Sequence, residues 1–174
     1  MGKVIESSDV VARNNADRAL QIEICTALEC LADGLLGSFN DGLACHLRTI
    51  VGISWAEHVA FQENVIFPIL KRCHADSQSV HSQLEQLEAE HGMIADQGHE
   101  IIEQLEMMQA GEFSNADMFG YMLRSAFQDR RRHLEWECHL IDSKLPQILA
   151  PVDRDLLSHW LTRHGWPRAF MSSH

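Results

Sequence analysis

The sequence predicts an all-α fold, an up-down-up-down four-helix bundle with a short C-terminal fifth helix. Long segments rich in Leu, Glu, Gln, Ala and Met, which are good helix formers, lie between a few short turn-forming stretches. No segment shows the two-residue alternation of β-branched and polar residues that indicates a strand. Because the connections between the long segments are short, we expect neighbouring helices to run antiparallel.

Four segments carry apolar residues at the spacing of one helical face, over residues 18–35, 51–65, 84–105 and 119–140. A capping box at residues 114–117 marks the start of the fourth helix. Pro151 suits the first turn of a fifth helix, while Gly165 and Pro167 suit its end. The expected organisation is an N-terminal tail (1–13), a four-helix bundle (14–149), and a short C-terminal helix with its tail (150–174).

The composition disfavours several classes of protein. The 174 residues include 14 Lys and Arg against 25 Asp and Glu, a formal net charge of −11, so we expect no nucleic-acid partner. No apolar run approaches the ~18 residues of a membrane span, and the N-terminus lacks the apolar core of a signal peptide. The five cysteines form no Cys-x-x-Cys motif, which is typical of reduced thiols in a cytoplasmic protein.

Four polar residues interrupt the apolar faces of three different helices: His58, His91, His133 and Glu137. A buried histidine or carboxylate must be hydrogen-bonded or must coordinate a metal ion. His133 and Glu137 are four residues apart and therefore project from the same side of one helix. We predict that these four residues form a metal site, and that nearly all of the other histidines lie at the surface.

Several motifs make residues 15–150 resemble the hemerythrin-like, or HHE cation-binding, domains. Residues 58–70 contain a His followed by Phe67-Pro68, as in the second helix of that family. Glu90-His91 and residues 131–137 are similar to its third-helix Glu-His and its fourth-helix His-x-x-x-Glu. The resemblance implies a four-helix bundle with a non-haem di-iron centre that binds or senses oxygen, nitric oxide or peroxide, or that handles iron.

The sequence departs from that family at three expected ligand positions. Arg18 stands where the first helix should supply a histidine, and a guanidinium cannot ligate a cation. Gln62 stands where a bridging glutamate is expected, with Glu63 one residue further on. Ala95 stands where the third helix often supplies a second ligand.

These departures disfavour two irons and leave two interpretations. In the first, His58, His91, His133 and Glu137 hold a single ion, iron or alternatively zinc, with Glu63 and Gln62 as secondary candidates. In the second, the site is vestigial and metal-free, Arg18 pairs with Glu137 in place of the metal charge, and the bundle is a protein-interaction or regulatory module.

Other features suggest no specific chemistry. The sequence contains no nucleophile elbow, phosphate-binding loop or dinucleotide fingerprint. An enzyme is therefore less expected than a binding protein, and catalysis would require a metal ion with an open coordination position. The basic cluster of Arg124 and residues 130–132 is interpreted as a solvated helix face. Trp160, Trp166 and Phe170 are expected either to cover one end of the bundle or to form a homodimer contact.

Overall fold

The computed structural model describes residues 6–35, 37, 39–112, 115–146 and 149–167. Within these ranges the regular structure is helical and includes no strand, which confirms the all-α prediction. The elements in chain order are α1 (Ser7–Gly34), α2 (Asp41–Phe61), the π-helix η1 (Gln62–Ile66), α3 (Phe67–Cys73), α4 (Gln78–Gln109), α5 (Ala116–Lys144) and α6 (Pro151–His164).

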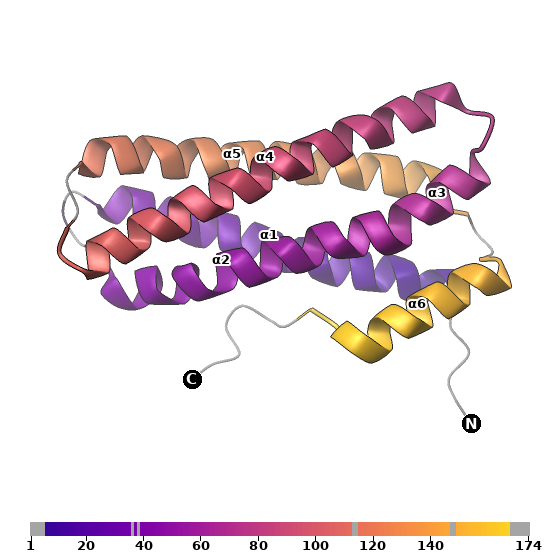
Figure 1. The fold of residues 1–174 in the computed structure, drawn as a ribbon, viewed down its shortest axis with the longest axis horizontal. Helices are drawn as coiled ribbons and strands as arrows, with labels where there is room; N and C mark the ends of the chain where they lie inside the picture. Colours follow the sequence, from indigo (N-terminus) through magenta and orange to yellow (C-terminus); the bar gives the residue numbers. More distant parts are fainter. Residues whose placement is uncertain (1–5, 36, 38, 113–114, 147–148, 168–174) are drawn as a thin grey trace.

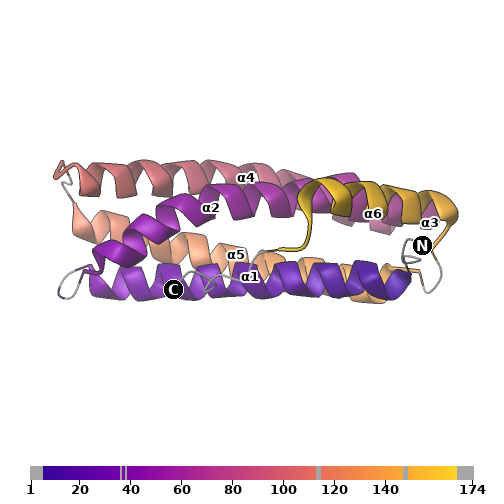
Figure 2. The same cartoon turned by 90° about the horizontal axis from the view of Figure 1, so that it is seen from below.

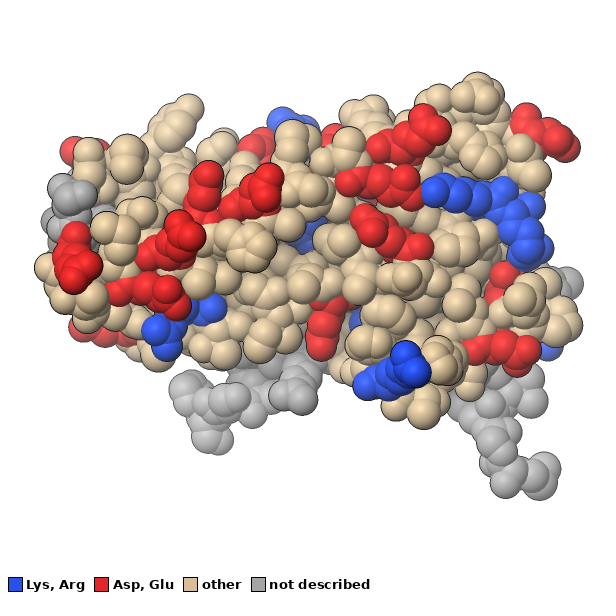
Figure 3. Space-filling model, viewed as in Figure 1, with Lys and Arg blue, Asp and Glu red and all other residues tan. Residues whose placement is uncertain are grey.

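The four long helices lie side by side (Figures 1 and 2). Helix α1 packs against α5 and α2, and α4 packs against α2 and α5. Helix α6 lies along the outside, where it contacts η1. Acidic side chains outnumber basic ones on the face shown in Figure 3, in keeping with the net charge of −11.

The helix ends follow from local sequence signals. The Asn40 and Asn115 side chains cap α2 and α5 by accepting backbone N–H groups at 2.9 Å. Helix α6 begins at Pro151 and ends before Gly165, whose φ of +69° favours glycine. The expected N-terminal tail is wrong for residues 7–13, which form the first turns of α1; residues 1–5 of that tail lie outside the described residues.

A π-helical turn interrupts the second long helical run, which the sequence predicted as one regular helix. The Phe67 N–H donates to the carbonyl of Gln62, five residues earlier. Pro68 has no N–H, so it cannot make the regular bond to the carbonyl four residues before it. Such turns are frequent at functional sites, and this one lies one turn after His58.

Two apolar clusters fill the interior, one at each end of the long helices. The first includes Leu28, Leu47, Val51, Trp55, Ile101 and Leu123. The second includes Phe61, Phe67, Leu84, Ile141, Leu157 and Trp160. Each long helical run also carries buried polar residues where the two clusters adjoin: Arg13, Asn14, Asp17, Gln21, Ser54, His58, Gln62, His91, Arg130, His133 and Glu137. The interior is therefore an apolar core divided by one polar layer.

Helix α6 is attached to the second cluster by one buried carboxylate and one aromatic ring. Asp153 accepts hydrogen bonds from Arg72 of α3 and from the Ala150 N–H at the start of its own helix. The Trp160 ring packs against Phe61, with centroids 5.8 Å apart. Trp160 therefore packs on the second cluster, in line with the first of its two expected roles, whereas Trp166 is exposed and Phe170 lies outside the described residues.

The close packing of α2 on α4 predicts that a glycine-to-leucine substitution changes the free energy of unfolding in opposite directions at two positions of α4. A Cβ at Gly98 would lie 2.9 Å from Cε3 of the buried Trp55, whereas one at Gly92 would meet no atom within 4 Å. Gly98→Leu is expected to lower the free energy of unfolding by about 1–3 kcal/mol through overpacking. Gly92→Leu is expected to raise it by up to ~1 kcal/mol through helix propensity. Urea denaturation measures both, and equal changes would contradict the packing described.

Candidate metal centre

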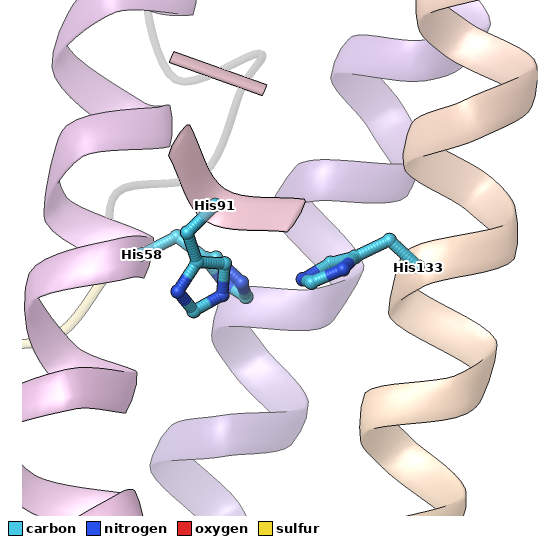
Figure 4. Close-up of side chains that lie close together, drawn as sticks. All are labelled: His58, His91 and His133. Carbon is cyan, nitrogen blue, oxygen red and sulfur yellow. The ribbon is translucent and has the colours of Figure 1, made fainter. Parts of the chain in front are cut away.

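Three histidine side chains from three helices meet in the polar layer. His58 of α2, His91 of α4 and His133 of α5 are buried, and one ring nitrogen of each lies within 4.8 Å of those of the other two. The ring centroids of His91 and His133 are 5.0 Å apart, and that of His58 lies 6.0 and 6.3 Å from them. Figure 4 shows the three rings converging between the helices.

Each imidazole is held by a carboxylate at Nδ1. His58 Nδ1 lies 2.5 Å from Asp17 Oδ2 on α1. His91 Nδ1 lies 2.9 Å from Glu63 Oε1, and His133 Nδ1 lies 2.8 Å from Glu90 Oε2. An ionised carboxylate only accepts hydrogen bonds, so Nδ1 carries the proton and Nε2 of a neutral ring presents its lone pair. Carboxylate partners of this kind orient metal-ligating histidines.

The atoms that face the interior of the cluster have no hydrogen-bond partner. Among the described residues, this holds for Nε2 of all three histidines and for Oε2 of Glu137. Glu137 Oε2 lies 3.1 Å from His58 Nε2 and 3.7 Å from His133 Nε2, but neither contact is an aligned hydrogen bond. A buried atom left unpaired costs about 1–3 kcal/mol. Three imidazole nitrogens and one carboxylate oxygen are a donor set suited to zinc or ferrous iron.

The charges around Glu137 and His133 favour the protonation states in which these two residues bind a cation. Burial alone would raise the pKa of Glu137, but His58, His133 and Arg130 outweigh it and hold the pKa below its usual range. Burial and then Arg130 lower the pKa of His133 to about 2. Glu137 is therefore an anion and His133 a neutral imidazole near neutral pH.

His58 differs from the other two histidines. Burial and Arg130 lower its pKa. The carboxylates of Glu137 and Asp17, one at each ring nitrogen, raise the pKa by a larger amount, so the net shift is upward. For Asp17, burial raises the pKa, and the contact with His58 outweighs burial and lowers it overall. The His58 ring therefore lies between two carboxylates that stabilise its charged form.

Two buried arginines lie next to the histidines, each over an aromatic ring of α2. The Arg13 guanidinium lies 4.3 Å above Phe61, and its Nη1 is 3.8 Å from Asp17 Oδ1. The Arg130 guanidinium lies 5.7 Å from the Trp55 ring. The expectation that Arg130 belongs to a solvated face is wrong, because its side chain is completely buried. Its place in the apolar stripe, three residues before His133, was the signal for that burial.

The structure separates the secondary candidates from the four central residues. Glu63 supports His91 at Nδ1 rather than joining the inward-facing atoms. Gln62 is buried and donates a 2.7 Å hydrogen bond to Asn14 of α1. Arg18 is half-buried and donates to the Cys138 thiol, so the expected pairing of Arg18 with Glu137 does not form.

Sequence reasoning missed Asp17 and Glu90 as the partners of His58 and His133. The other histidines lie away from the cluster: His46, His74 and His81 are half-buried, and His99, His139, His159 and His164 are exposed. His174 lies outside the described residues.

The fold and the site together define an all-helical protein with a buried cluster of three histidines and one carboxylate. Neither a family model, nor a curated protein, nor a solved structure matches the chain. Among the described helices, none has the length and apolar character required to cross a bilayer.

The lowered pKa of His133 predicts how the stability of the chelator-treated protein depends on pH. The folded protein keeps this imidazole neutral, whereas the unfolded chain takes up a proton below about pH 6.5. His91, whose pKa is also lowered, adds to this fall, whereas His58, whose pKa is raised, contributes stability that is fully present below the unfolded pKa and is not lost on acidification. Stability should therefore fall from pH 6.5 to about pH 5, by up to ~1.4 kcal/mol per pH unit from His133. Urea midpoints should fall less in His133→Gln, and an equal fall in both proteins would contradict this assignment.

Proposed function

We propose that the chain is a hemerythrin-like, up-down-up-down four-helix bundle that binds one metal ion. Nε2 of His58, His91 and His133 and Oε2 of Glu137 would hold the ion, iron first and zinc as the alternative. One observation carries the proposal: these four buried atoms lack partners, while Nδ1 of every histidine is held by a carboxylate. That combination is what a metal site requires of its ligands and of the residues around them.

The surroundings favour one ion over two. A second cation beside Glu137 would lie in a layer that already contains the buried guanidinium groups of Arg13 and Arg130. Gln62, at the position of a bridging carboxylate, is neutral and bonded to Asn14. Like charges that are close together in a medium of low dielectric constant repel strongly.

The proposed role is to bind or sense a small molecule such as oxygen, nitric oxide or peroxide. An iron ion supplies affinity for such ligands when protein atoms leave part of its coordination sphere open. Two surface hollows reach the carboxylates that support the histidines. Glu63 lines a hollow of about 340 Å³ between α2 and α4, and Glu90 lines one of about 440 Å³ between α4 and α5. Each hollow therefore brings solvent against a carboxylate that is hydrogen-bonded to one of the three histidines.

A metal-free interaction module is the alternative, and one observation favours it. Within the polar layer, the two buried carboxylates, Asp17 and Glu137, are matched in number by the two buried guanidinium groups of Arg13 and Arg130. Arg130 would then supply the compensating charge first assigned to Arg18. Metal analysis separates this function from the first.

Removal of one ligand should abolish metal binding. Wild-type protein reconstituted with Fe²⁺ without oxygen is expected to retain about one ion per chain and to melt at a higher temperature, by mass action. His91→Ala should retain none, whereas His99→Ala, an exposed histidine two turns further along α4, should behave as wild type. Elemental analysis and thermal melts measure both properties. No retained metal in wild type, after iron and zinc reconstitution, would refute the metal-binding proposal.

Neutralising a supporting carboxylate should weaken metal binding without removing a ligand. Glu90→Gln is expected to lower metal affinity by about 10–100-fold, because the amide orients and polarises His133 less effectively than a carboxylate. Glu85→Gln, at an exposed position on the same helix, serves as the matched control. Competition with a chromogenic chelator gives both affinities. Equal affinities in the two variants would show that Glu90 does not support a ligand.

A further inference from the structure

Arg130 is a completely buried cation whose hydrogen-bonding capacity is mostly unused. Its Nη2 donates a 3.0 Å hydrogen bond to Gln21 Oε1, and within the described part of the chain its Nε and Nη1 have no partner. Burial of a charge is tolerated when it is paired and hydrogen-bonded, and is costly otherwise. The free donors of Arg130 therefore indicate a missing acceptor.

The position of Arg130 is fixed beside the histidines. It lies one turn before His133 on α5, and Gln21 holds it from α1. Gln21 is itself held by a 2.8 Å hydrogen bond to Ser54 Oγ, one turn before His58 on α2. The guanidinium also lies 5.7 Å from the Trp55 ring. Contacts from α1 and α2 thus hold the guanidinium of α5 in the same buried polar layer as the three histidines.

The charge of Arg130 reaches the whole cluster. It lowers the pKa of each of the three histidines, and it also lowers the pKa values of Asp17 and Glu137. Glu137 is in turn the strongest anionic influence on Arg130, ahead of Asp17. Glu137 is therefore the principal counter-charge of Arg130 when no cation is bound.

A cation at Glu137 changes this balance. A divalent ion on that carboxylate would neutralise the charge that stabilises Arg130 and would add a second positive centre to the same buried layer. We propose that Arg130 binds a small anion, which enters the site together with the divalent ion and accepts hydrogen bonds from Nε and Nη1. This inference rests on the proposed metal site and specifies the class of its additional ligand as anionic.

Arg13, the other buried arginine, is not suited to this role. Its Nε and Nη1 also lack hydrogen-bond partners among the described residues, but Nη1 lies 3.8 Å from Asp17 Oδ1, so this guanidinium already has a carboxylate beside it. Asp17 is bound to His58 through Nδ1, the nitrogen that faces away from the proposed ion. Arg13 therefore stabilises a supporting carboxylate, whereas Arg130 is free to contact a ligand.

The test uses Co²⁺ as the metal and azide as the anion. Cobalt stoichiometry and affinity are measured first, and azide is then titrated while the visible spectrum of the bound cobalt is recorded. Arg130→Met removes the charge and the donors but keeps an unbranched chain over Trp55. Arg131→Met is the matched control, because it removes the same charge from the adjacent position, where the arginine pairs with Glu29 at the surface.

Two opposite changes are expected in Arg130→Met. Azide affinity should fall by about tenfold to hundredfold, the range for loss of charge-assisted hydrogen bonds. Cobalt affinity should stay equal or increase, because a neighbouring positive charge has been removed. A merely structural role for Arg130 would lower both affinities. Arg131→Met should leave both unchanged.

The possible failures are distinguishable. If wild type binds no cobalt, the proposed metal site fails; if it binds cobalt but azide affinity is the same in Arg130→Met, only the anion site is refuted. If circular dichroism shows that Arg130→Met is unfolded, Arg130→Gln takes its place. Wild type provides an independent check, because azide must tighten cobalt binding by the factor by which cobalt tightens azide binding. Cobalt affinity that does not depend on azide would overturn the inference.

Discussion

The hydrogen bond between each imidazole Nδ1 and a carboxylate is the interaction on which the centre of this protein depends. Asp17 reaches His58 from α1, Glu63 reaches His91 from the π-helical turn, and Glu90 reaches His133 from α4. Each bond joins two different helical segments, so the same contacts that set the orientation of the rings also fix the helices relative to one another. Because Nδ1 is occupied, all three rings direct Nε2 toward one point.

The apolar clusters offset the free-energy cost of the buried polar layer. The net free energy of unfolding of a domain is about 5–15 kcal/mol. Four unpaired buried atoms, at about 1–3 kcal/mol each, destabilise the fold by a comparable amount. Tightly packed side chains at both ends, such as Leu28 and Leu47 in one cluster and Phe67 and Leu84 in the other, must offset that loss. A bound cation would relieve it directly, which couples occupancy of the centre to the stability of the whole chain.

The sequence was sufficient to predict the long helices and to predict which histidines lie in the interior, because both follow from the periodicity of apolar residues. His58, His91 and His133 occupy positions where apolar residues are expected, and this anomaly is visible without any structure. Their carboxylate partners could not be predicted in the same way. Glu63 and Glu90 retain exposed fractions of 39% and 22%, and residues at the edge of a helix turn inward or outward according to small rotations of that helix.

Two arginines show the same limit. Arg18 was placed inside by analogy with a ligand position, but α1 is rotated so that its neighbour Asp17 faces the centre. Arg130 was assigned to a solvated face as one member of a basic cluster with Arg131 and Arg132; its own position in the apolar stripe determines its burial. The composition of the neighbouring sequence was misleading about the burial of Arg130. The spacing of ligands in the hemerythrin-like family was misleading about the position of Arg18.

The π-helical turn makes the length of the segment 62–66 as important as its composition. Glu63 and Phe67 both contact His91. Glu63 is hydrogen-bonded to Nδ1, and the Phe67 ring stacks parallel to the imidazole with centroids 5.6 Å apart. A π-helical turn contains one residue more than an α-helical turn, so deleting one residue here would restore regular α-helix while the helix beyond it kept its orientation. The change would fall on the turn itself, which carries Glu63. The extra residue in this turn therefore matters for the carboxylate at Nδ1 of His91 and not for the direction of α3.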